Sequence, residues 1–325
     1  MKTAECARSL REEIGKIIVG KQEIVDLVVT AVLSGGHVLL DDLPGSGKTT
    51  LVRTLALALG CEYKRIQFTP DLLPSDVLGM TVFNQKTGDF ERKVGPIHTN
   101  LLLADEINRA IPRTQSALLE AMEERQITID GETYPQPDPF FVMATQNPVE
   151  KESTFPLPAA QMDRFFMKLS MGYPSREEEV QMLSELGDET PYQKVSAAAS
   201  PQLLQDLREE IRGVYLNEEV KAYIVELVHR TREHGQLKTG ASPRASRSLF
   251  QGSKACAAMD GRDYVTPEDV QKLMLPVLSH RVVLTGEARY SGRTPEEILQ
   301  EIIRDTPVPP AKEAWFDGKA EGIRE

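Results

Sequence analysis

Asp42-Leu-Pro-Gly-Ser-Gly-Lys-Thr49 is the stretch that decides the fold. It follows a short apolar run at 37–40, which predicts a buried strand, and it opens a predicted helix that ends near Gly60. A glycine-rich turn in this position is typical of a phosphate loop, because successive backbone N–H groups and the helix N-terminus can surround phosphate oxygens. A chance glycine-rich turn is the competing explanation, and the acids described below argue against it. We expect the nucleotide-binding residues of this loop to be Pro44, Gly45, Ser46, Gly47, Lys48, Thr49 and Thr50.

Two side chains of the loop have specific expected partners. Lys48 is expected to reach the β- and γ-phosphates of ATP, and the Thr49 hydroxyl is expected to bind Mg²⁺. The consensus for such loops has glycine at the first position, where this chain has Asp42. We therefore expect the entry of the loop to accommodate a residue with a Cβ atom.

Two acids end the buried strand predicted at 101–104. Asp105 is expected to hold Mg²⁺, and Glu106 is expected to polarise the attacking water. Two solvated acids at a strand end would be the ordinary interpretation of this pair alone. Together with the phosphate loop, the pair predicts hydrolysis of ATP to ADP and phosphate.

Four further polar residues are candidates for the same chemistry. Asn147 follows the strand predicted at 140–144 and can orient the water or contact the γ-phosphate, although Asn-Pro is also a common turn. Arg109, Arg164 and Arg244 could each neutralise charge that develops during phosphoryl transfer. Composition alone does not separate these arginines from ordinary salt-bridging ones.

The order of the predicted elements gives the fold class. Strands alternate with helices up to about residue 174, which predicts an α/β domain with a mostly parallel sheet flanked by helices. Helical patterns follow at 175–187, 200–213, 217–235, 242–259 and 266–280, which predicts a smaller all-helical domain. The expected division is 1–180 for the nucleotide-binding domain, 181–310 for a helical lid and 311–325 for a tail.

Composition narrows the class of protein. The 325 residues carry a formal net charge of −11, which argues against a general nucleic-acid-binding protein, whose surface would be basic. The sequence contains no uncharged apolar run of about 18 residues, so no membrane insertion is expected. The N-terminus lacks the apolar core of a secretory signal, and we expect a cytoplasmic protein.

Several motifs in order along the chain resemble the MoxR family of AAA+ ATPases. They cover nearly the whole chain, which makes them more specific than the phosphate loop alone. The matching segments are 43–49, 103–110, 115–124, 144–148, 161–165, 172–178, 240–244 and 280–284.

The resemblance implies roles for particular residues. Lys48 and Thr49 match the Walker A pair, and Asp105 and Glu106 match Walker B. Asn147 matches sensor 1, Arg164 the arginine finger that enters the next subunit's site, and Arg244 sensor 2 of the helical lid. Val19 and Gly20 match the segment beside the adenine, although Lys21 replaces the more usual glutamine.

The resemblance also implies an assembly. An arginine finger that acts in trans requires a homo-oligomeric ring, expected to be a hexamer. Two predicted hairpins, around Thr87-Gly88-Asp89 and around Asp130-Gly131, match elements that commonly face the pore of such rings. Family members are thought to act as chaperone-like remodelers of partner complexes, often with a metal-ion-adhesion-site protein encoded nearby. The partners expected for this chain are a client protein complex, with a metal-ion-adhesion-site (VWA) protein as one candidate.

Three other functions remain open at this point. A phosphotransferase built on the same loop needs an acceptor site, and nothing in the sequence marks one. A subunit of a metal-insertion motor like magnesium chelatase is a close relative in fold, but the chain lacks the long insert of that class. A DNA-handling motor is disfavoured by the acidic balance.

Overall fold

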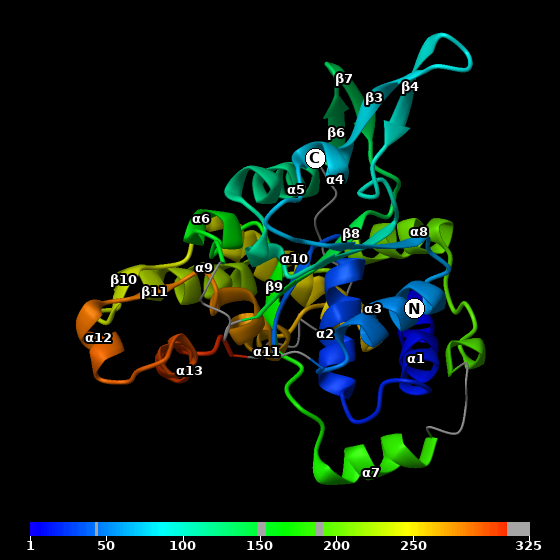
Figure 1. Ribbon diagram of the computed structural model, residues 1–325. Coiled ribbons are helices and arrows are strands. Elements are labelled where there is room, and N and C mark those ends of the chain that lie inside the picture. The colour runs from blue at the N-terminus through cyan, green and yellow to red at the C-terminus, as the bar shows by residue number, and fades with distance from the viewer. Residues whose placement is uncertain (43–44, 148–153, 186–190, 311–325) are drawn as a thin grey trace, which may run out of the picture. The chain divides into compact units, whose positions relative to one another are not determined.

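The computed structural model describes residues 1–42, 45–147, 154–185 and 191–310 (Figure 1). Contacts divide the chain into two compact units. One holds 9–165 and 169–205, and the other holds 1–8, 166–168 and the chain from 206 onward. The predicted limits 1–180, 181–310 and 311–325 remain predictions, and the tail lies outside the described residues.

Four of the five strands in the sheet β2-β5-β8-β1-β9 belong to the first unit, where they form its centre. The strands of the sheet are β1 (Val38–Asp41), β2 (Tyr63–Gln67), β5 (Leu101–Asp105), β8 (Phe141–Gln146) and β9 (Met167–Leu169). The pairs β1–β8, β2–β5 and β5–β8 are parallel. This confirms the predicted α/β phosphate-loop fold.

Burial explains why the central strands read as continuous apolar runs. All but the last residue of β1, β5 and β8 are buried, because helices cover both faces of the sheet. The covering helices include α2 (Gln22–Leu33), α3 (Lys48–Ala58) and α5 (Pro112–Glu124). Two further helices are α1 (Lys2–Gly15), which is divided between the two units, and the largely exposed α7 (Arg176–Glu185). The core around Leu39, Leu102 and Phe165 is fully buried.

Register brings the polar ends of these strands to one edge of the sheet. Asp41 pairs with Gln146, and Gln67 pairs with Asp105. In an open parallel sheet, ligands bind beyond the carboxyl ends of the strands. This edge therefore holds the phosphate loop, the two acids and Asn147.

Both predicted hairpins are present and lie side by side (Figure 1). One consists of β3 (Gly79–Asn84) and β4 (Asp89–Val94), and the other of β6 (Gln126–Ile129) and β7 (Glu132–Pro135). Thr81 N donates to the Asp130 carboxylate at 3.1 Å, and Arg92 pairs with Glu132 at 2.7 Å. Short helical segments complete this unit: α4 (Pro74–Leu78), η1 (Ile107–Arg109), α6 (Ala159–Met162) and η2 (Pro191–Lys194).

The second unit is helical, as predicted. Its helices are α8 (Pro201–Arg212), which begins in the first unit, α9 (Glu218–Glu233), α10 (Pro243–Met259), α11 (Pro267–Leu278), α12 (Gly286–Tyr290) and α13 (Pro295–Asp305). A short antiparallel ladder of β10 (Leu237–Thr239) and β11 (Val283–Leu284) accompanies them. Strands of two or three residues are too short to give a period-2 pattern, so the sequence did not predict this ladder.

Candidate functional site

The phosphate loop joins β1 to α3 through two left-handed glycines. Gly45 has φ of 81° and Gly47, the N-cap of α3, has φ of 87°. Residues with a Cβ atom rarely adopt this conformation, so glycine here allows the close wrapping that a phosphate requires. Pro44 lies outside the described residues.

A cavity of about 380 Å³ opens at this loop and gathers the predicted site. Its lining residues are Gly45, Ser46, Gly47, Lys48, Thr49, Thr50, Asp105, Glu106 and Asn147. The Lys48 ammonium donates to the main-chain oxygen of Asp42 at 2.9 Å. One cavity therefore contains a cation, a hydroxyl at the start of a helix, two carboxylates and an amide.

Thr145 fixes the two acids relative to each other. Its hydroxyl is fully buried at the end of β8, donates to Asp105 Oδ1 at 2.6 Å and accepts from the Glu106 backbone N–H at 2.8 Å. Glu106 has a left-handed backbone with φ of 56°, an uncommon conformation for a residue with a side chain. This turn separates the two carboxylates immediately after the strand.

Three further side chains hold the carboxylates, and the sequence did not predict their roles. Arg65 on β2 binds Asp105 Oδ2 at 2.6 Å and donates to Gln67 Oε1 at 2.7 Å. Gln67 in turn donates to Glu106 Oε2 at 2.7 Å. Arg109, one of the three candidate arginines, binds the same oxygen at 2.9 Å.

A local signal for two of these residues exists in the sequence. Arg65 and Gln67 flank the buried Ile66, so the strand alternates polar and apolar and both polar side chains share one face. Only the register between β2 and β5 shows which acids they meet.

Asn147 lies directly beyond β8 and lines the cavity. It is buried, and its main-chain oxygen accepts from Asn108 Nδ2 at 3.5 Å. The predicted sensor-1 residue is therefore close to the phosphate loop and to the acids that follow β5.

Arg164 is not among the residues that line this cavity. It lines a second cavity of about 450 Å³ with residues of α5, and its guanidinium binds Glu123 at 3.2 Å. Arg244 belongs to the other compact unit, where it follows the N-cap Ser242 in the first turn of α10. The finger and sensor-2 roles of these arginines remain predictions.

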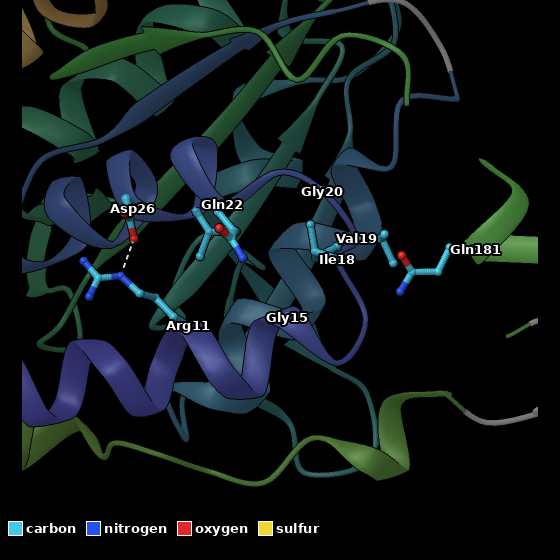
Figure 2. Close-up of a pocket in the computed structure, with 9 residues that line it drawn as sticks. Arg11, Gly15, Ile18, Val19, Gly20, Gln22, Asp26 and Gln181 are labelled. Carbon is cyan, nitrogen blue, oxygen red and sulfur yellow. Dashed lines mark hydrogen bonds and ion pairs between the residues drawn. The ribbon is translucent and has the colours of Figure 1, made fainter. Parts of the chain in front are cut away.

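Val19 and Gly20 line a third cavity, of about 420 Å³ (Figure 2). In Figure 2, an ion pair between Arg11 and Asp26, with 2.5 Å between Nε and Oδ1, lies on one side and Gln181 of α7 on the other. Gly20 has φ of 72°, and a Cβ atom there would collide with the Glu178 side chain. Glycine at this position therefore allows α7 to pack against the Val19–Gly20 segment.

Comparison with known proteins gives the family. The model of the ATPase family associated with various cellular activities (AAA) matches residues 37–167, and the AAA lid domain model matches 229–302. Chaperone MoxR1 of Mycobacterium tuberculosis is 42% identical over 306 residues, which cover 91% of this chain and 81% of that protein. The chain belongs to the MoxR family of AAA+ ATPases.

Two other proteins are similar to this MoxR-family chain over almost its full length. YeaC of Bacillus subtilis, an uncharacterized protein, is 49% identical over 93% of this chain and 95% of its own length. The crystal structure of a candidate ATPase from Cytophaga hutchinsonii superposes with a TM-score of 0.90 at 40% identity, covering 95% of this chain and 96% of the other.

The family membership has two direct consequences. The AAA domain makes this MoxR-family chain a nucleotide-binding protein of an ATPase family. The matched lid domain lies within the helical second unit.

Among the helices in the described part of the chain, none has the length and apolar character needed to span a membrane.

Proposed function

We propose that the chain hydrolyses ATP to ADP and phosphate within a homo-oligomeric ring and uses this energy as a chaperone-like remodeler of partner protein complexes. The cavity at the phosphate loop carries the proposal, because it brings Lys48, Thr49, Asp105, Glu106 and Asn147 to one place. These groups match the parts that phosphoryl transfer requires.

The residues of the cavity fit ATP and Mg²⁺. Gly45 and Gly47 leave the loop free of side chains at its tightest turns, and Lys48 supplies a cation for the phosphates. Thr49 and Asp105 offer a hydroxyl and a carboxylate, the hard oxygen ligands that Mg²⁺ prefers. When bound, Mg²⁺ would neutralise charge on the phosphate oxygens.

Glu106 polarises the attacking water in this proposal. Its Oε2 is held by Gln67 and Arg109, which aims the carboxylate before ATP binds. Asn147 orients the water or the γ-phosphate. Val19 and Gly20 bind the adenine side of the nucleotide in the third cavity.

In this proposal, Arg164 and Arg244 make the ATP site one that two subunits share. Arg164 lines a cavity other than that of the phosphate loop, which supports a role on a neighbouring subunit, and Arg244 acts from the lid. We propose a hexameric ring in which each finger completes the adjacent site. The chaperone name of the Mycobacterium tuberculosis relative supports client proteins as partners, with a VWA-domain protein as the first candidate.

Replacing Glu106 with glutamine tests the chemistry. Glu106→Gln is expected to bind ATP with wild-type affinity and to release phosphate at least about 100-fold more slowly, because the amide is a poor base. Glu226→Gln, which removes a carboxylate from an exposed ion pair with Arg230, serves as control and is expected to hydrolyse normally. Phosphate release in the absence of any acceptor would distinguish a hydrolase from a phosphotransferase. Unchanged turnover by Glu106→Gln would disprove the assigned role.

The same variant tests the partner proposal. An ATP-locked Glu106→Gln ring is expected to retain a purified VWA-domain protein on a size-exclusion column with ATP and to release it with ADP. Elution at the same separate positions under both conditions would exclude that class of client.

A further inference from the structure

Asp42 occupies the position where phosphate loops have glycine, and both oxygens of its carboxylate accept hydrogen bonds. The residue is 4% exposed, and its Oδ2 accepts from Met171 N at 2.7 Å. Its Oδ1 accepts from Ser170 Oγ at 2.7 Å and from Gly172 N at 3.0 Å. Glycine at this position has no atoms that could make any of these bonds.

The main chain of Asp42 has a different partner. Its carbonyl oxygen accepts from the Lys48 ammonium, the group proposed to bind the phosphates. One residue therefore contacts the loop lysine through its backbone and the 170–172 turn through its side chain. A phosphate that recruits Lys48 competes with the bond to Asp42, so loop occupancy has a direct route to that turn.

The chain that follows this turn forms a wall of the third cavity. Within the first unit, residues 170–181, which we term the strap, run from Asp42 to Gln181 on α7. Lys21 fastens the strap to the Val19–Gly20 segment, because its ammonium donates to Tyr173 O at 3.0 Å and lies 3.7 Å from Glu178. Figure 2 shows Gln181 on the side of the cavity next to Val19.

We propose that Asp42 is a positioning residue that couples the phosphate loop to the cavity at Val19 and Gly20 through the strap. The inference rests on the proposed function, in which this cavity holds the adenine side of ATP. The Asp42 carboxylate holds the start of the strap at 170–172, and the Lys21 ammonium holds it further along, at Tyr173 and Glu178. Asp42 thus lets the phosphate-binding and base-binding regions respond to each other.

Asp42→Gly tests this role, because it restores the loop consensus and removes all three carboxylate bonds. Binding of ATP and of inorganic tripolyphosphate is measured by calorimetry with Mg²⁺ on the full chain. ATP affinity is expected to fall about tenfold, a typical coupling between sites, while tripolyphosphate affinity changes by less than about twofold. Hydrogen exchange at the Met171 and Gly172 amides is expected to accelerate.

Lys21→Met tests the second attachment of the strap, at Tyr173 and Glu178. It is expected to cause the same selective loss of ATP affinity, and the double variant with Asp42→Gly is expected to lose no more than either single one, because both break one connection. Asp76→Asn is the matched control, since Asp76 also accepts a backbone N–H, from Leu73 at 2.8 Å, but lines neither cavity. It is expected to bind both ligands normally.

Other outcomes would overturn either the coupling role of Asp42 or the proposed function. Equal losses for ATP and tripolyphosphate in Asp42→Gly, or no loss for either, overturn the coupling role. Failure of the wild-type chain to bind ATP overturns the proposed function instead. If Asp42→Gly does not melt cooperatively, Asp42→Asn replaces it, since the amide retains one acceptor oxygen, and a smaller selective loss in the same direction is then required.

Discussion

Thr145 shows how one hydroxyl organises a site at the scale of a single residue. Its hydroxyl bonds to both acidic residues at once, to Asp105 Oδ1 and to the Glu106 backbone N–H. Removing it takes the partner from the part-buried Glu106 N–H and from Asp105 Oδ1, which costs more than losing an exposed hydrogen bond. Thr145 is therefore expected both to stabilise the fold and to position the two acids.

Thr145→Val is predicted to lower the free energy of unfolding by about 1–3 kcal/mol, because buried polar groups lose their partner. Phosphate release is predicted to slow at least about tenfold, since both acids lose the bond that fixes them relative to each other. Thr54→Val is the matched control: Thr54 is equally buried, and its hydroxyl has no hydrogen-bond partner among the described residues. Urea unfolding of both variants is the measurement, and equal stabilities would contradict the prediction.

Helix α1 is capped by a side chain from elsewhere in the chain. The half-buried Glu210 carboxylate of α8 accepts from Lys2 N at 3.2 Å and from Thr3 N at 2.9 Å, and the Thr3 hydroxyl adds a bond of 2.6 Å. Burial raises the pKa of Glu210, but the bonds from Thr3 and Lys2 and the nearby N-terminal charge lower it by more. Both ends of this contact belong to the second unit.

The lowered pKa of Glu210 gives a pH dependence with a defined sign. A carboxylate whose pKa is lower in the folded chain stabilises it above the unfolded pKa of about 4.3 and loses this effect as pH falls through the folded pKa. Glu210→Gln is predicted to cost about 1 kcal/mol at pH 7, the usual value of a helix cap. The difference from wild type should shrink between pH 5 and pH 3, because the wild-type carboxyl then becomes neutral too.

Glu209→Gln is the control for this element. Glu209 lies next to Glu210 on the same helix but forms only an exposed ion pair with Arg212. Its replacement is predicted to change stability by less than about 0.5 kcal/mol at every pH. Chemical unfolding at several pH values measures both variants, and a Glu210→Gln effect that stays constant down to pH 3 would contradict the assignment.

At the scale of the whole molecule, the role proposed for Arg164 connects one chain to a neighbouring one. In the single chain its guanidinium binds Glu123 and lines a cavity formed with α5, whereas the nine residues at the phosphate loop do not include it. In the proposed ring, Arg164 acts only in the site of a neighbouring subunit. The proposed ring therefore makes a prediction about mixtures of chains.

Arg164→Ala and Lys48→Ala are each predicted to be inactive alone but partly active when mixed. In a random ring of equal parts, about a quarter of the sites would combine an intact Lys48 with an intact neighbouring Arg164, if the finger acts in trans. Phosphate release is measured after the two variants are mixed and reassembled. Arg230→Ala, at an exposed pair with Glu226, is the arginine control. A mixture as inactive as its components, or an active Arg164→Ala alone, would refute the finger role.

Local patterns in the sequence predicted the central elements but not their long-range contacts. The apolar runs, the glycine-rich loop and the Asp-Gly turn each carry their signal within a few residues, and the sheet, α3 and the hairpins are present. The short strands β10 and β11 lack such a signal. The predicted parallel order of the strands was enough to bring the polar strand ends together. The structure places these residues in one cavity: Lys48, Thr49, Asp105, Glu106 and Asn147. The bonds of Asp42 to 170–172 and of Arg65 to Asp105 join residues about 130 and 40 positions apart, so no local pattern contains them.

The left-handed backbone of Glu106 has an evolutionary consequence. A residue with a Cβ atom loses roughly 1–2 kcal/mol in this conformation, whereas glycine adopts it freely. Selection for the proposed hydrolysis therefore acts against the preference of the chain at this position. A homologous subunit that does not hydrolyse ATP has no need for glutamate at this position. In such a pseudoenzyme we expect glycine at the aligned position. Such a substitution should raise the melting temperature while it silences the ring.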